Sequence, residues 1–515
     1  MQGISIMTRL GLFKLMIGLT LFLMLGSSVD FQAQAQPMPR WAPDQKVPGY
    51  LNDTLTPLLI ADRNRTVHAF VSQWIDDGGD RRQAIVYRKW SLAGGWTRPV
   101  DVILDPSGKD AILLGAYLDG GGLLHVAFSG GEGRGAVIYH SSAPVDQADS
   151  VTSWSLPEII GTGILGLNSA ALSGDGQSGL MLIYSGNLDG NGVYAISSLN
   201  QGKTWSEPIQ VFLAPESNLF PYSLRLIPSS DGRQLRATWN MVTNLGVDEQ
   251  LYFTSYDLAT KKWTRSIQLD QRRQLPEYFG PSFPVIGDTG SELVIMYNGG
   301  NPFTGLPVDV GRPVQMATVS NDGGLTWNAP SVPFPFHVGR SGEHTMAVDG
   351  MGIAHVLFIQ RIENNVNGKY TIIGGIWHSV FEGGSWSTPE RFVTTYSPHD
   401  VRSVVVQGNV LLVVWREDPG EGQHGIWYSY LKLDSSELPV TPLPTINAPA
   451  TADTSLTTLP TPVFELPVPT NPVLTDLEKD SSGSTNPAVP LIVAVVVVLG
   501  VLVMAVVLYS LRTRA

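Results

Sequence analysis

An aromatic residue recurs at almost constant intervals over most of this chain. It ends the second strand of each of seven apolar hairpins, whose turns are usually rich in Gly, Asp or Asn. These aromatic residues are Phe70, Phe128, Tyr184, Trp239, Tyr297, Phe358 and Trp415, with successive separations of 58, 56, 55, 58, 61 and 57 residues. A period sustained in this way predicts a repeat protein in which each unit is built on a β-hairpin.

Each hairpin is followed by a third apolar strand, and in six of the seven units a tryptophan then opens a fourth. These tryptophans are Trp96, Trp154, Trp205, Trp263, Trp327 and Trp386. The seventh unit has none, but Trp41 precedes the first hairpin, so we expect the N-terminal strand to complete the last sheet and close a ring. Four antiparallel strands per unit predict an all-β fold, a seven-bladed β-propeller, with six blades as the alternative count. An open solenoid would have shorter repeats and no complementary strand at the opposite terminus.

The composition narrows the chemistry that this body can perform. The 515 residues include no cysteine, which excludes disulfides, thiolate metal sites and a thiol nucleophile. Lys plus Arg is 33 and Asp plus Glu is 45, a net charge of −12 that argues against a nucleic-acid partner. Three histidines, His68, His125 and His355, hold similar positions on separate units and would not converge on a metal. We therefore expect packing roles for them, and neither a metal nor a cofactor.

Both ends of the chain carry targeting signals. Residues 1–35 contain a basic start, a short apolar run and small residues near a cleavage point, which predicts a signal peptide. After the body, 36–434, comes a Pro/Thr-rich segment, 435–487, typical of an extended extracellular stalk. An uncharged apolar stretch then predicts a transmembrane helix at 488–511, and a short basic tail, 512–515, would be cytoplasmic. We expect a single-pass membrane protein with its body outside the cell.

One short stretch, SNDGGLTW, connects the repeat to a known family. It fits the pattern Ser-x-Asp-x-Gly-x-Thr-Trp through Ser320, Asp322, Gly324, Thr326 and Trp327. This pattern is the Asp box, and the body resembles the sialidase superfamily of Asp-box (BNR repeat) propellers. A second copy, SLNQGKTW, keeps Ser198, Gly202 and Trp205 but has Asn200 at the acidic position. Because Asn can replace Asp there, we interpret Asp322 as part of a turn, where Asp or Asn accepts backbone N–H groups and Gly supplies a positive φ.

The resemblance implies an exo-acting glycosidase on sialic-acid-like sugars. Sialidases are similar in using three arginines for the substrate carboxylate, a tyrosine nucleophile paired with a glutamate, and an aspartate acid/base. Their first arginine lies in a motif that opens the first blade. The corresponding stretch here reads Thr54-Leu55-Thr56-Pro57, so Leu55 stands at that position. The family also has six blades, whereas seven units are counted in this chain.

The loops between second and third strands, and those between units, should line the central pocket. They supply several acids, bases and cations, among them His344 and Asp400. From this set we expect catalytic roles for Asp80, Glu277 and Tyr278. For substrate binding we expect Arg82, Arg340, Glu343, Arg402 and Arg416, because converging guanidinium groups bind a carboxylate bidentately.

Two functions remain open on the sequence. The first is a cell-surface, sialidase-like glycoside hydrolase with an altered catalytic set. The second is a non-catalytic propeller that displays a binding face for a glycan or a surface protein. The charged loops favour the first function, and Leu55 at the arginine position favours the second.

Overall fold

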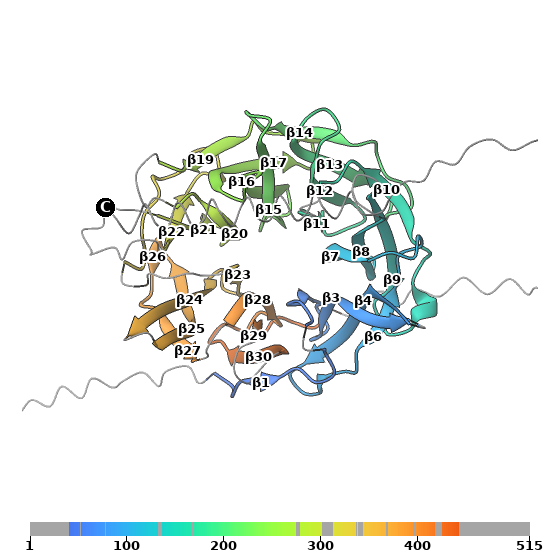
Figure 1. Ribbon diagram of the computed structural model, residues 1–515, viewed down its shortest axis with the longest axis horizontal. Helices are drawn as coiled ribbons and strands as arrows, with labels where there is room; N and C mark the ends of the chain where they lie inside the picture. Colours follow the sequence, from blue (N-terminus) through green and yellow to red (C-terminus); the bar gives the residue numbers. More distant parts are fainter. Residues whose placement is uncertain are drawn as a thin grey trace, which may run out of the picture. The chain divides into compact units, whose positions relative to one another are not determined.

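The computed structural model describes residues 41–441, apart from 52, 78, 132–135, 166–168, 274–278, 301–312, 336, 338–342, 367–368, 395–397 and 418–424. Within these residues the chain forms seven antiparallel sheets around a ring, so the predicted seven-bladed β-propeller is confirmed (Figure 1). The predicted signal peptide, transmembrane helix and cytoplasmic tail lie outside the described residues, as does the stalk beyond Thr441. No helix in the described part of the chain is long and apolar enough to cross a membrane.

The first three blades follow the chain in order. Blade 1 contains β2 (Leu58–Ala61), β3 (Val67–Asp77), β4 (Asp80–Ser91), β5 (Gly95–Trp96) and β6 (Val100–Ile103). Blade 2 contains β7 (Ile112–Leu118), β8 (Leu123–Gly130), β9 (Val137–Pro144) and β10 (Glu158–Thr162), with a short 3-10 helix at Val151–Ser153. Blade 3 contains β11 (Ala170–Gly174), β12 (Leu180–Gly186), β13 (Gly192–Ser198) and β14 (Ile209–Leu213).

The other four blades complete the ring. Blade 4 contains β15 (Leu219–Pro228), β16 (Gln234–Thr243), β17 (Asp248–Asp257), β18 (Lys262–Trp263) and β19 (Ile267–Gln271). Blade 5 contains β20 (Ser282–Asp288), β21 (Leu293–Gly299) and β22 (Val314–Ser320), and an isolated bridge between Ala317 and Ser331 stands in its fourth place. Blade 6 contains β23 (Thr345–Val348), β24 (Ala354–Val366), β25 (Lys369–Glu382), β26 (Ser385–Trp386) and β27 (Glu390–Val393). Blade 7 contains β28 (Pro398–Val406), β29 (Val410–Glu417), β30 (Gly425–Lys432) and β1 (Gln45–Lys46).

The N-terminal segment closes the ring, as we predicted from the tryptophan strand that the seventh unit lacks. Strand β1 pairs antiparallel with β30, and the two lie side by side although they come from opposite ends of the body (Figure 1). Trp41, just before β1, stacks on Phe392 of blade 6 with ring centroids 3.9 Å apart. Trp154 of blade 2 lies edge-on to Phe70 of blade 1. Each of these tryptophans packs against the preceding blade. Trp41 therefore has the same role in blade 7 as Trp154 has in blade 2.

The repeated aromatic residues form the centre of each blade. All seven are at most 1% exposed, which places the core between adjacent sheets rather than on the axis of the ring. The second-strand histidines are buried among them and bonded to third-strand neighbours. His68 Nδ1 lies 2.8 Å from the Tyr87 hydroxyl, and His125 Nδ1 lies 3.1 Å from His140 Nε2.

Antiparallel alternation puts the turns after first strands and after third strands on one face, which we call the turn face. The SNDGGLTW turn after β22 belongs to it. Asp322 Oδ1 accepts the Thr326 backbone N–H at 2.9 Å, and the Thr326 hydroxyl donates to Oδ2 at 2.5 Å. The Ser320 Oγ accepts the Gly324 N–H at 2.9 Å. The pKa of Asp322 falls to about 2, first because of the Thr326 hydroxyl bond and then because of its backbone bond. The carboxylate is therefore fully engaged in a local turn.

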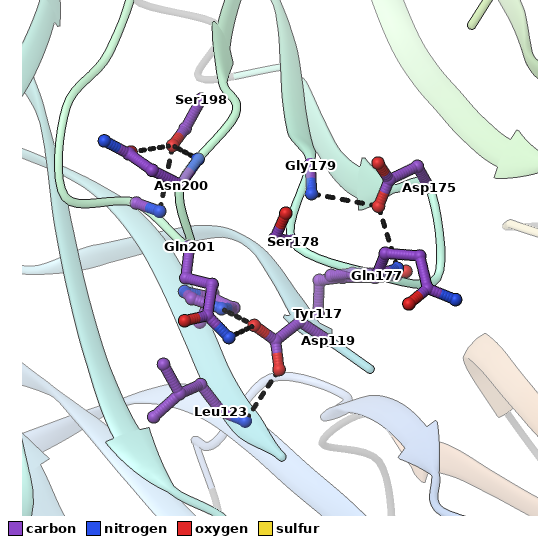
Figure 2. A network of polar contacts seen from close by, with 12 residues as sticks. Tyr117, Asp119, Leu123, Asp175, Gln177, Ser178, Gly179, Ser198, Asn200 and Gln201 are labelled. Atoms are coloured by element: carbon purple, nitrogen blue, oxygen red, sulfur yellow. Dashed lines mark hydrogen bonds and ion pairs between the residues drawn. The ribbon is translucent and has the colours of Figure 1, made fainter. Parts of the chain in front are cut away.

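The second copy of this turn connects two blades. Asn200 Oδ1 accepts the Thr204 N–H at 3.0 Å, as Asp322 does in its own turn. Its neighbour Gln201 donates at 3.0 Å to Asp119 Oδ2, and Asp119 Oδ1 accepts the Leu123 N–H within a blade 2 turn (Figure 2). The polar side chains of these two turns are thus satisfied by backbone groups and by the adjacent blade.

Candidate functional site

A cavity of about 550 Å³ lies on the ring axis and is lined by residues from the first strands of all seven blades. These innermost strands, including β7, β11, β15, β20, β23 and β28, surround the centre in Figure 1. Much of the lining is apolar, and its charged groups come from β15, from the residue pair just before β23 and from β28. These three strands begin on the face opposite the turn face, which we call the pocket face. A cavity of this size with a few converging polar groups has the dimensions of a small-ligand site.

Three of the innermost strands carry the same irregularity on the pocket face. The register of β15 shifts between Tyr222 and Arg225, and β20 and β28 shift at similar positions. Each shift contains a non-glycine residue with positive φ: Ser223 at 50°, Phe283 at 51° and Asp400 at 46°. A non-glycine residue in this conformation costs about 1–3 kcal/mol and is concentrated at functional sites. The bulges re-aim the side chains that follow them, as β-bulges beside active sites do.

Two arginines placed after these bulges meet at one carboxylate. Arg225 Nη2 lies 3.2 Å from Glu343 Oε2, and Arg402 Nη2 is bonded to the same oxygen. All three side chains remain 21–28% exposed and line the cavity. Two guanidinium groups held in this way present further N–H donors to the cavity and can bind an anion.

The two arginines keep Glu343 ionised. Burial would raise the pKa of Glu343, yet the charges of Arg402 and Arg225 outweigh it and bring the pKa to about 2. Burial also lowers the pKa of Arg225, and the charge of Glu343 opposes that change. Beside the cluster, Asp400 Oδ2 lies 3.7 Å from Arg416 Nη2.

A tyrosine in the cavity wall has a raised pKa, and so does an aspartate whose charge acts on it but which is not among the residues lining the cavity. Burial, and then the negative charges of Glu343, Asp248 and Asp400, raise the pKa of the Tyr222 phenol, which stays protonated at neutral pH. Tyr222 pairs with Asn240 across β15 and β16, and Asn240 Nδ2 donates to Asp248 Oδ1 at 2.7 Å. Burial raises the pKa of Asp248 to about 7. A carboxyl group near this value can hold or release a proton at physiological pH.

His344 lies in the wall of the same cavity and is only 1% exposed. Burial lowers its pKa to about 3, so its imidazole is neutral at physiological pH. Neither ring nitrogen has a hydrogen-bond partner among the described residues. His344 therefore adds no charge to the cluster.

The structure brings together some of the residues that the sequence predicted for the site. Glu343 and Arg402 line the cavity in direct contact, and Arg416 lies beside them through Asp400. Arg82 pairs with Ile75 in the β3–β4 hairpin and is not among the lining residues. Asp80 opens β4, and its side chain is not described. The remaining predicted residues, Glu277, Tyr278 and Arg340, lie outside the described residues.

Sequence reasoning missed Arg225, Tyr222 and Asp248. Arg225 had a signal, because it interrupts the otherwise apolar run LRLIP in the first strand of its hairpin. The first-blade stretch with Leu55 does reach the cavity, and Leu55 itself is 47% exposed there. The arginine pair is therefore contributed by blades 4 and 7, whereas the first blade supplies the aliphatic Leu55.

No protein-family model and no curated protein matches the chain. Solved structures do match it. A polysaccharide lyase of family PL25, an ulvan lyase, has a TM-score of 0.50 and 13% identity over 77% of this chain and 96% of that one. The same enzyme bound to -[GlcA(1-4)Rha3S]- matches with a TM-score of 0.50 and 12% identity over the same shares. The intramolecular trans-sialidase from Ruminococcus gnavus has a TM-score of 0.39 and 14% identity over 76% of this chain and 96% of that one, too low to support an inference. At these identities the likeness concerns the propeller fold.

Proposed function

We propose that the protein is a cell-surface glycan-binding propeller that seats a carboxylate-bearing sugar, such as a uronic or sialic acid, in its central cavity. The observation that carries this proposal is the convergence of Arg225 and Arg402 on the cavity from two bulged strands. Guanidinium forks match a carboxylate bidentately, and Tyr222 offers an aromatic face and a hydroxyl to a sugar ring. The PL25 structure with a GlcA-containing ligand supports the idea that this fold can hold a uronic acid.

The path of the chain supports display at a surface. After β30 the backbone crosses the turn face, where the Leu438 N–H donates to Gln407 O at 2.7 Å and the Thr441 N–H donates to Arg63 O at 3.2 Å. Gln407 lies five residues beyond Arg402, or about 17 Å along a strand. The segment 435–487 would thus leave from the face opposite the charged cluster. In our proposal this stalk and a membrane helix at 488–511 hold the cavity away from the cell surface.

Binding is tested on the full-length protein purified in detergent. Isothermal titration with methyl β-D-glucuronide should give a saturable signal, and the neutral methyl β-D-glucoside should bind at least about tenfold more weakly. Arg402→Gln should weaken glucuronide binding about 10- to 100-fold, because a hydrogen bond to a charged group contributes roughly 1.5–3 kcal/mol. The matched control is Arg233→Gln, the same change at a highly exposed arginine on the turn face. Equal affinity for both sugars, or equal loss in both variants, would refute the proposal.

A second candidate function is hydrolysis of the bound glycan, and Asp248 is the observation that favours it. Its pKa of about 7 suits a general acid that protonates a leaving oxygen. Release of a fluorogenic aglycone from sialic-acid and glucuronic-acid glycosides measures this activity. We expect Asp248→Asn to abolish turnover and to leave binding within about threefold. Binding without any turnover by the wild-type protein would leave the non-catalytic function standing alone.

A further inference from the structure

The two pocket arginines, Arg225 and Arg402, contact a single oxygen of Glu343, and each has further N–H groups that this contact does not use. Each uses Nη2 for Glu343, and each Nη1 donates to the carbonyl of the residue before it, Leu224 at 3.2 Å and Val401 at 3.4 Å. A guanidinium has five N–H donors, so the remaining donors can receive a ligand while Glu343 stays in place. The carboxylate of Glu343 is then a permanent neighbour of any bound anion.

Glu343 is the carboxylate in direct contact with both arginines, whereas Asp400 is paired with Arg416. A ligand carboxylate bound by Arg225 and Arg402 would therefore lie beside Glu343. A second anionic group on the same sugar would be repelled by the charge of Glu343 as it enters this part of the cavity.

We propose that Glu343 sets the charge of the ligand, so that the cavity accepts a sugar with one negative charge and discriminates against one with two. This inference rests on the proposed function. The physical reason is repulsion between like charges in a partly desolvated cavity, where screening by water is weak. Specificity of this kind comes from an unfavourable contact with the wrong ligand as much as from a favourable contact with the right one.

A purely positioning role for Glu343 makes a different prediction. If Glu343 only held the two guanidinium groups in place, removing its charge would loosen them and weaken every anionic ligand alike. If its charge selects the ligand, removing that charge improves binding of a doubly charged sugar relative to a singly charged one. The ratio of the two affinities therefore separates these roles.

The experiment compares two probes on the full-length protein in detergent by isothermal titration. Methyl β-D-glucuronide carries one negative charge, and its 3-O-sulfate carries two. We expect the wild-type protein to bind the sulfated sugar no more tightly than the unsulfated one. Glu343→Gln should shift the affinity ratio about tenfold or more toward the sulfated sugar, while Glu343→Asp keeps the wild-type preference. Exposed Glu207→Gln is the matched control.

Each alternative result overturns the inference in a recognisable way. An unchanged ratio in a folded Glu343→Gln protein, or equal loss of both probes, would assign Glu343 a positioning role only. Tighter binding of the sulfated sugar by the wild-type protein would overturn the inference without any variant. Absence of binding to either probe, with Arg402→Gln indistinguishable from wild type, would refute the proposed function and the inference with it.

Discussion

Asp322 and Asp248 are both aspartates at the ends of blade strands, but they lie on opposite faces and in opposite environments. On the turn face, Asp322 accepts a backbone N–H and a hydroxyl, and its pKa falls to about 2. On the pocket face, Asp248 receives one amide bond from Asn240 while burial raises its pKa to about 7. An aspartate side chain is therefore kept ionised at position 322, whereas at position 248 it is held near its titration midpoint.

The same difference is seen in neighbouring groups of each face. On the turn face, Asp119 accepts a backbone N–H of its own turn and a hydrogen bond from Gln201 of the next blade (Figure 2). On the pocket face, two bulged strands, β15 and β28, carry arginines that keep N–H donors for a ligand. Satisfied polar groups stabilise a fold, whereas incompletely satisfied ones mark the place where a ligand completes the structure.

The largest effect is expected from a glycine on the turn face. Gly324 has φ +95°, and a Cβ built there would lie 2.4 Å from the Phe253 ring of the preceding blade. Gly324→Ala should lower the free energy of unfolding by about 3 kcal/mol, from backbone strain and from overpacking together. Gly323→Ala is the matched control: its φ is +75° and nothing lies within 4 Å of the added Cβ, so the loss should be about 1 kcal/mol. Equal losses in urea unfolding would show that blade packing does not require Gly324.

A variant on the pocket face, Asp248→Asn, should instead raise the free energy of unfolding. Between about pH 4 and pH 7 the folded protein keeps the Asp248 proton that the unfolded chain releases, so stability falls as the pH rises through this window. Asp248→Asn cannot ionise and can still accept the Asn240 bond. It should be more stable than wild type by about 1–3 kcal/mol at pH 8 and nearly equal at pH 4. A gain that is the same at both pH values, measured by urea unfolding, would contradict this assignment.

The blade count could be predicted from the sequence because each blade is built from local hairpins whose aromatic spacing records the repeat. Ring closure could be predicted as well, since Trp41 stands alone at one end and a tryptophan strand is missing at the other. The arginine pair could not be predicted, because Arg225 meets Glu343 and Arg402 only when blades 4, 6 and 7 surround one axis. The bulges could not be predicted either, since Ser223 and Phe283 are not residue types that indicate a positive φ.

The smallest effect is expected from Asp322→Asn, because the second copy of the turn already has an asparagine, Asn200, at this position. The turn at Asn200 keeps the bond from Thr204 N–H to Oδ1, and Asn200 Nδ2 donates to the Thr204 hydroxyl at 2.9 Å in place of the bond that an aspartate would accept. Asp322→Asn should therefore form the same turn, with an unfolding midpoint within about one degree of wild type at pH 7, and with glucuronide affinity unchanged.

The stability of the variant and that of the wild-type protein should differ only at acidic pH. The lowered pKa of Asp322 contributes stability that is present above its ordinary value near 4 and is lost as the pH falls toward 2, and the asparagine variant lacks this loss. Thermal unfolding at pH 7 and pH 3 measures both halves of the prediction. A large change at pH 7, or any loss of glucuronide binding, would mean that Asp322 does more than hold its turn and that the two faces are less separate than their contacts indicate.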